Sequence, residues 1–260
     1  MAIQKAIQKS GILSPWRNPL DPSDRFYRRV SAITRAIMNM NSTQFATLSE
    51  PEVLDSDFEI EWVGAKFDSS TGTLFGGVLE KQTAIVVDVN PGLRLFAYDS
   101  SGFVTPVLEA SAFDTSKFTD GKLHNVRVVY SGGVVSLYVD GNILLTDTWN
   151  LSSAVGLGVV GARDTTAFRT MSGNVLSFKV WKNGDRNTGE LVTDLRFDEP
   201  DTIYQRNYAS PIADENDPDW SGAILENVLP GDWETITRKA GDDFWVGDGD
   251  RVIEYAEGAL

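Results

Sequence analysis

The amino-acid sequence predicts an all-β protein in which two antiparallel sheets pack as a sandwich. Short runs of alternating apolar and polar residues recur along the chain, and turns rich in glycine or proline separate them. The clearest example is a pair of runs, 125–130 and 134–139, joined by Ser131-Gly132-Gly133. Alternation on both sides of a Gly-Gly joint predicts a β-hairpin, with Val126, Val128 and Tyr130 on one face.

Further strands are predicted in chain order on both sides of this hairpin. Residues 58–62 alternate cleanly, and residues 84–89 are more continuously apolar, as expected for a buried strand. The turn 90–92 leads to a hairpin partner at 93–98, and two later strands are expected at 155–160 and 174–181. Turn signals at this spacing are typical of a two-sheet sandwich.

The chain divides into three zones by composition, with predicted boundaries at 1–42, 43–198 and 199–260. The first zone is a basic arm: residues 1–40 hold seven Lys or Arg against two Asp, a net charge of +5. Pro15 and Pro19 predict extended backbone before them. A helix is predicted over 22–40, begun by Asp21 and Pro22 and patterned at helical spacing by Phe26, Val30, Ile33 and Ile37.

The second zone is the sandwich, and the third is an acidic extension. Because the whole chain carries −14, the 220 residues after residue 40 carry −19. The third zone nevertheless contains Trp220, Trp233, Phe244, Trp245 and Tyr255. Acidic disordered tails usually lack such aromatic residues. We therefore expect a small β element there, packed on the body or on a partner.

The central hairpin also resembles a known family. The pattern Asp120-Gly-x-x-His124, a strand, a Gly-Gly turn and then Leu137-Tyr-Val-Asp-Gly141 resembles the central hairpin of laminin G-like domains. Residues 58–62 and 174–181 resemble the early and closing strands of that family. The resemblance implies a concanavalin A-like jelly roll.

Composition excludes several classes of function. The sequence contains no cysteine, which excludes disulfides, thiolate zinc sites and a cysteine nucleophile. The acidity of the body opposes general nucleic-acid binding through phosphate repulsion. No apolar run is long enough for a membrane-spanning helix or, near the N-terminus, for a signal segment. We therefore expect no membrane insertion and synthesis in the cytoplasm without export.

His124 is the only histidine in the sequence. A Ser-His-Asp hydrolase would have to use it, but no Gly-x-Ser-x-Gly motif accompanies it. The resemblance implies that a residue at this hairpin position belongs to the strand framework. We therefore expect His124 to be structural.

Glu59 and Glu61 stand two apart on a predicted strand and share one face. Retaining glycoside hydrolases need two carboxyl groups about 5–5.5 Å apart, so this pair is the candidate for such chemistry. The longer acidic motif of hydrolases with this fold is missing. Two solvated glutamates on an outer face are the preferred interpretation.

Calcium is the one metal ion that the loops suit. The resemblance implies a rim site built from aspartates and backbone carbonyls, and oxygen-rich turns fit a hard cation. Aspartate is also expected in turns for backbone reasons alone. The candidate ligands are Asp88, Asp99, Asp140 and Asp164; no other cofactor is expected.

Loop aromatics are the candidates for ligand binding. Aromatic rings suit sugar faces and protein interfaces equally, so the sequence leaves both open. The candidates are Phe103, Trp149, Trp220 and Trp245.

The layout of arm, sandwich and tail resembles virion proteins of bacteriophages that carry laminin G-like domains. It implies a non-enzymatic structural protein on a capsid surface or tail, bound to other virion proteins and to further copies of itself. A glycan-binding module for host recognition is the first alternative, and a glycoside hydrolase is the second. The expected docking residues lie in the arm: Arg17, Arg25, Phe26, Arg28, Arg29 and Ile33.

Overall fold

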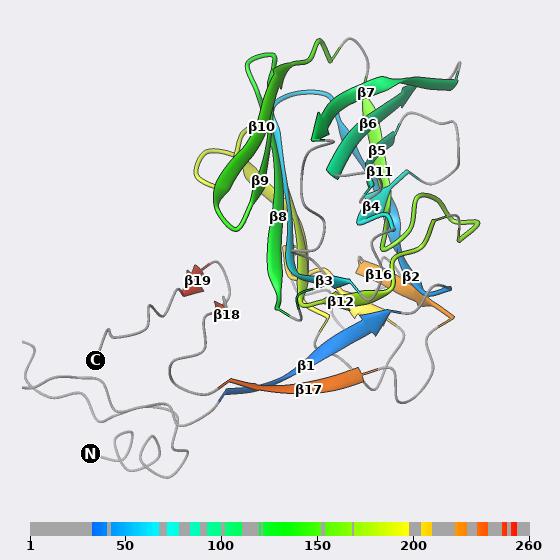
Figure 1. Cartoon of the computed structure of the whole chain (residues 1–260), viewed down its shortest axis with the longest axis vertical. Coiled ribbons are helices and arrows are strands. Elements are labelled where there is room, and N and C mark those ends of the chain that lie inside the picture. Colours follow the sequence, from blue (N-terminus) through cyan, green and yellow to red (C-terminus); the bar gives the residue numbers. More distant parts are fainter. Residues whose placement is uncertain are drawn as a thin grey trace, which may run out of the picture. The chain divides into compact units, whose positions relative to one another are not determined.

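The computed structural model is all-β over the residues that it describes: 33–40, 43–67, 72–77, 84–88, 93–99, 102–110, 120, 122–151, 154–167, 169–197, 204–209, 222–227, 233–238, 246–248 and 251–253. Residues 36–234 form one compact unit, and 1–35 with 235–260 form a second. The first unit contains two layers of sheet that face each other (Figure 1). The predicted two-sheet sandwich is confirmed.

The first sheet has nine strands, in the order β10-β9-β8-β3-β12-β1-β17, with β13 on β3 and β14 on β13. Its strands are β1 (Ile33–Met40), β3 (Phe58–Phe67), β8 (His124–Ser131), β9 (Val134–Val139), β10 (Asn142–Thr148), β12 (Gly173–Val175), β13 (Ser177–Lys182), β14 (Glu190–Leu195) and β17 (Trp233–Arg238).

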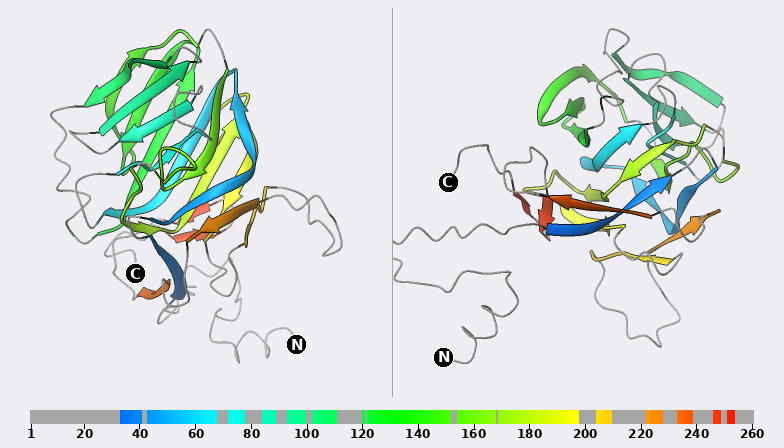
Figure 2. Two further views of the ribbon diagram at one scale, coloured as in Figure 1. Left: turned by 90° about the vertical axis from the view of Figure 1, so that its right-hand side faces the viewer. Right: turned by 60° about the horizontal axis from the view of Figure 1, so that its bottom comes forward.

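The second sheet has eight strands, in the order β15-β16-β2-β11-β5-β6-β7, with β4 on β11. Figure 2 shows the two layers from two further directions. The strands are β2 (Phe45–Leu54), β4 (Phe75–Gly76), β5 (Ala84–Asp88), β6 (Leu93–Asp99), β7 (Gly102–Ala110), β11 (Val155–Val160), β15 (Tyr204–Arg206) and β16 (Gly222–Glu226).

The central hairpin forms as predicted. Val126 pairs with Val139 and Tyr130 with Val135 across β8 and β9. Gly132 and Gly133 both have positive φ, at 57° and 84°, which is the backbone that a two-residue turn of this twist requires. The burial of β8 alternates along its length, so its apolar face meets the core and its polar face does not.

The core lies between the sheets and is built from the inward faces of the strands. Phe58, Ile60 and Trp62 of β3 are fully buried, and Phe178 of β13 packs edge-on against Trp62 with ring centroids 6.3 Å apart. Alternation in β3 therefore sends the residues between them, Glu59 and Glu61, to the opposite face of the sheet.

The predicted helix over 22–40 is wrong where the structure describes it. Residues 33–40 form strand β1, which pairs antiparallel with β12 through Met38 and Val175. Ile33, Thr34 and Ile37 are β-branched and suit a strand. Pairing with β12 satisfies the backbone of this segment, and it overrides the helical spacing seen in the sequence. Residues 22–32 lie outside the described residues.

The acidic C-terminal zone supplies strands to the sandwich. β16 pairs with β2 from Ala223–Leu48 to Glu226–Phe45, and β15 pairs with β16. Beyond β17, residues Val246–Asp248 (β18) and Arg251–Ile253 (β19) form a two-stranded sheet of their own. The predicted single strand over 174–181 is two strands, β12 and β13, interrupted at Leu176.

Candidate functional site

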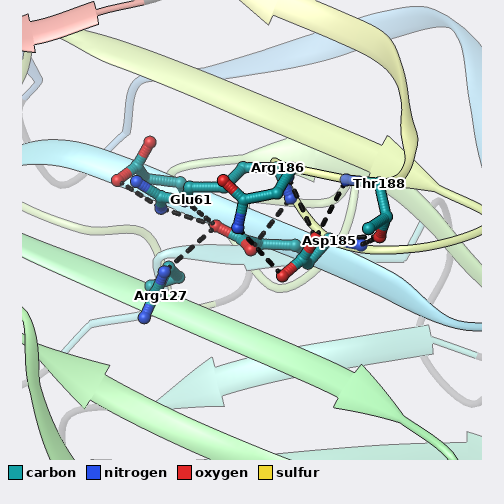
Figure 3. A network of polar contacts seen from close by, with 7 residues as sticks. Glu61, Arg127, Asp185, Arg186 and Thr188 are labelled. Atoms are coloured by element: carbon teal, nitrogen blue, oxygen red, sulfur yellow. Dashed lines mark hydrogen bonds and ion pairs between the residues drawn. The ribbon is translucent and has the colours of Figure 1, made fainter.

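The two glutamates of β3 are buried carboxylates on the outer face of the first sheet. Glu59 is 0% exposed and Glu61 is 5% exposed. The expectation of two solvated glutamates is therefore wrong. The reason is tertiary: the loop between β13 and β14 folds back over this face and covers them (Figure 3).

Residues 183–189 of that loop have a compact fold set by Asp185. One carboxylate oxygen of Asp185 accepts hydrogen bonds from the backbone N–H of Asn187 and from the N–H and hydroxyl of Thr188, at 2.9–3.1 Å. These bonds, the Thr188 hydroxyl first, lower the pKa of Asp185. Gly184 has φ +149°, and a Cβ there would lie 2.5 Å from Oγ1 of Thr188. The sequence Gly-Asp-x-x-Thr-Gly thus specifies the loop.

This loop places Arg186 directly over both glutamates. Its Nε donates to Oε1 of Glu59 at 2.6 Å, and its Nη2 contacts Glu59 and also donates to Oε1 of Glu61 at 2.9 Å. Its backbone N–H donates to the other oxygen of Glu59 at 3.2 Å. Burial opposes the charge of Arg186, but the carboxylates of Glu61 and Glu59 outweigh it and raise the pKa of the guanidinium.

The network continues across five strands as a row of alternating charge. From β14 to β9 the outer face carries Asp194, Lys179, Glu61, Arg127 and Tyr138, each opposite the next in the strand register. Lys179 lies 3.6 Å from Asp194, Arg127 lies 3.6 Å from Glu59, and the Arg127 guanidinium stacks 4.0 Å from the Tyr138 ring centroid. Opposite charges on neighbouring strands stabilise this register.

The chemistry open to Glu59 and Glu61 follows from these contacts. A glycosidase needs one carboxyl group that can give up a proton and one that can reach a sugar. Both oxygens of Glu59 accept hydrogen bonds from Arg186, and the Glu59 side chain is 1% exposed. The pair is arranged as an ion-paired support for the sheet and the loop.

His124 forms a second polar cluster at one end of the hairpin. Its Nδ1 lies 2.7 Å from Oδ2 of Asp140, and its Nε2 lies 3.2 Å from Oδ1 of Asp120. The bond to Asp140, followed by that to Asp120, raises the pKa of His124 against the effect of burial. The other oxygen of Asp140 accepts the backbone N–H of Asn125. His124 therefore joins the chain before β8 to the β9–β10 turn.

The four calcium candidates are placed in different surroundings. Asp140 lies in this cluster, with φ 50° in the turn before Gly141. Asp164 is fully buried after β11; one oxygen accepts from Thr166, and Oδ2 has no hydrogen-bond partner. Asp88 and Asp99 end β5 and β6. No group of three metal-binding side chains occurs within the described residues.

The aromatic candidates are only partly placed. Trp149 packs edge-on against Tyr130 with centroids 5.3 Å apart, and against Phe58 at 6.3 Å, so its ring belongs to the core margin. Phe103 lies in β7, and Trp220 and Trp245 lie outside the described residues. Sequence reasoning missed Tyr204 and Tyr208, which are 50% and 36% exposed at the β15 edge.

Of the expected docking residues, only Ile33 is described, and it begins β1. Arg17, Arg25, Phe26, Arg28 and Arg29 lie outside the described residues. Within the described part of the chain, no helix has the length and apolar character needed to cross a membrane.

No protein-family model matches the sequence, and no curated protein matches it. Solved structures are similar to the chain at low identity. The extracellular region of zebrafish Gpr126/Adgrg6 is 15% identical over 58% of this chain and 22% of that one, with a TM-score of 0.44. Domains LG4-5 of the mouse laminin alpha1 chain are 19% identical over 57% of this chain and 41% of that one, also with a TM-score of 0.44.

A heptameric SAP-like pentraxin from Limulus polyphemus is 15% identical over 79% of this chain and 94% of that one, with a TM-score of 0.41. The chain thus spans less than half the length of the first two proteins. At such TM-scores these overlaps carry no argument about function. The fold of this chain rests on its own strand pairings.

Proposed function

We propose that this protein is a non-enzymatic structural and adhesion module that docks to a larger particle through its basic arm and displays the sandwich. A bacteriophage virion, at the capsid surface or tail, is the particle that this layout suits. The non-enzymatic part of the proposal rests on one observation, the ion pairs that Glu59 and Glu61 form. Arg186 binds both carboxylates, and Arg127 adds a second positive charge beside Glu59.

The docking part is supported by the distribution of charge along the sequence. The first 40 residues carry +5 and the remaining 220 carry −19. A basic segment on an acidic body favours attachment to an acidic protein surface, and the body itself is repelled from nucleic acid. Further copies of the chain and other virion proteins are the partners proposed for this segment.

Two measurements test the proposal. Polysaccharide hydrolysis by the purified protein should be absent in wild type and in a Glu59→Gln, Glu61→Gln variant alike; hydrolysis that the double substitution abolishes would refute the non-enzymatic role. In phage particles, a chain that lacks residues 1–32 should be lost from the particle. Its incorporation at normal copy number would contradict the docking role.

Carbohydrate binding on the displayed sandwich is the second candidate function. It is favoured by the exposed rings of Tyr204 and Tyr208 and by two arginines beside Tyr208: Arg196 stacks 4.2 Å and Arg206 5.5 Å from the Tyr208 centroid. Rings and guanidinium groups together suit saccharides, acidic ones above all. A glycan array should show binding that Tyr204→Ala weakens. An array without any bound saccharide would remove this candidate.

A further inference from the structure

The row of charges on the outer face contains a lysine and an aspartate that are both buried and lie close to each other. Lys179 of β13 and Asp194 of β14 are direct cross-strand partners, and Nζ lies 3.6 Å from Oδ1. Both side chains are buried, at 11% and 1% exposure. Oδ1 of Asp194 accepts no hydrogen bond, although Nζ of Lys179 lies close to it.

The other oxygen of Asp194 has a different environment. Arg196 donates to Oδ2 through Nε at 3.3 Å and through Nη2 at 3.1 Å. A guanidinium that holds one carboxylate oxygen draws electron density from the carboxyl carbon and stabilises negative charge on that oxygen. The two oxygens are therefore distinct: Oδ2 is anchored, and Oδ1 faces the amine.

A third group stands on the opposite side of Lys179. Glu61 of β3 is its direct partner in the register and is 5% exposed. Cross-strand partners on one face have Cβ atoms about 4.5–5.5 Å apart, within reach of a lysine and a glutamate side chain. Lys179 is thus flanked by a carboxylate on either side.

Lys179 is the one lysine among the described ion pairs that involve Glu59, Glu61 and Asp194. The described ion pairs here form two groups: Arg127 and Arg186 with Glu59 and Glu61, and Lys179 and Arg196 with Asp194. Arginine stays protonated in proteins. Of these cations, only the lysine amine can act as a nucleophile, once it has given a proton to a neighbouring carboxylate.

From this geometry we propose that Lys179 and Asp194 form an intramolecular isopeptide bond. Nζ attacks Cγ of Asp194, and the negative charge of the tetrahedral intermediate rests on Oδ2, opposite Arg196. The C–Oδ1 bond breaks, and Oδ1 leaves as water with two protons that came from the ammonium group. Glu61 takes the first proton from Nζ, and that proton is then transferred to the leaving Oδ1. No oxidant or other reactant is needed, since an ammonium and a carboxylate give an amide and water.

The bond would close a covalent link between β13 and β14. In its sheet β14 pairs with β13; on its other side the described residues add only the Leu195–Asn207 bridge and a hydrogen bond from the Tyr208 N–H to the Asp194 carbonyl, so most of β14 is an edge. The fold holds the two reacting groups next to each other, so no bimolecular encounter is needed. A reaction that is slow in solution can therefore proceed inside the folded chain. A protein displayed on a particle gains resistance to peeling of this edge.

Intact mass spectrometry of the purified full chain tests the proposal. The expected mass is lower than the sequence mass by one water, about 18 Da. Trypsin should then release residues 170–182, uncut after Lys179, joined to residues 187–196. A full sequence mass overturns the proposal. A mass lower by one water without this linked pair also overturns it, because succinimide formation at an Asp-Gly pair gives the same loss.

Matched variants identify the groups. Lys179→Arg keeps the positive charge but cannot form the amide, so it should restore the full mass. Lys182→Arg, on the same strand, should retain the loss of water. Glu61→Gln should restore the full mass while the protein stays folded by circular dichroism. A linked Glu61→Gln protein would overturn the role of Glu61, and a linked Lys179→Arg protein would overturn the bond itself.

Discussion

Replacement of Arg186 by methionine gives the most direct test of how the outer face is held together. The substitution keeps most of the aliphatic stem and removes the charge that neutralises Glu59 and Glu61. Glu59 would keep a buried carboxylate, 1% exposed, which Arg127 still approaches to 3.6 Å. Three side-chain contacts from Arg186 to the two glutamates disappear.

The expected magnitude follows from this burial. Loss of one partner from a buried ion pair costs about 3–5 kcal/mol, because the other charge stays buried without compensation. The side chain of Arg186 is 30% exposed, so water screens part of the interaction and the lower end of this range applies. We expect Arg186→Met to lower the free energy of unfolding by about 3 kcal/mol.

Urea denaturation followed by tryptophan fluorescence measures this loss. Lys182→Met is the matched control, since it removes the Lys182–Glu52 pair, whose side chains are 28% and 17% exposed. That change should cost about 1 kcal/mol or less. Addition of Glu59→Gln to Arg186→Met should recover part of the loss. An Arg186→Met protein no less stable than the Lys182→Met control would refute the role given to the network.

Three further predictions concern other parts of the sandwich. The folded-state pKa of His124 is raised above about 6.5. Its contribution to stability is therefore fully present below pH 6.5 and is lost as the pH rises through the folded pKa. The urea midpoint of wild type should fall over that range, and the midpoint of His124→Gln should not. A parallel pH dependence in the two proteins would disprove this. Gly184→Ala should cost about 1–3 kcal/mol, because φ is +149° and the new Cβ would lie 2.5 Å from Thr188 Oγ1; an unchanged melting temperature would contradict the loop geometry. The unpartnered oxygen of Asp164 is a candidate calcium ligand, so calcium should raise the melting temperature of wild type but not of Asp164→Asn. An equal response in both proteins would exclude that residue as a ligand.

Local sequence determined most of the strand framework. The runs 58–62, 84–88, 93–98, 125–131, 134–139 and 155–160 lie in strands, because alternation and turn chemistry are local properties that a short window of residues contains. The Gly132-Gly133 turn is the clearest case, since the φ values it needs favour glycine.

Only the tertiary structure decided the rest. Residues 33–40 have helical spacing but form β1, because pairing with β12, far along the chain, satisfies their backbone. Glu59 and Glu61 read as solvated from alternation alone, yet Arg186, over 120 residues away, buries and neutralises them. Lys179 and Asp194 were not singled out in the sequence, and Glu61 was singled out only with Glu59. Strand register alone brings them together, because register depends on which strands pair, and no local pattern specifies that choice.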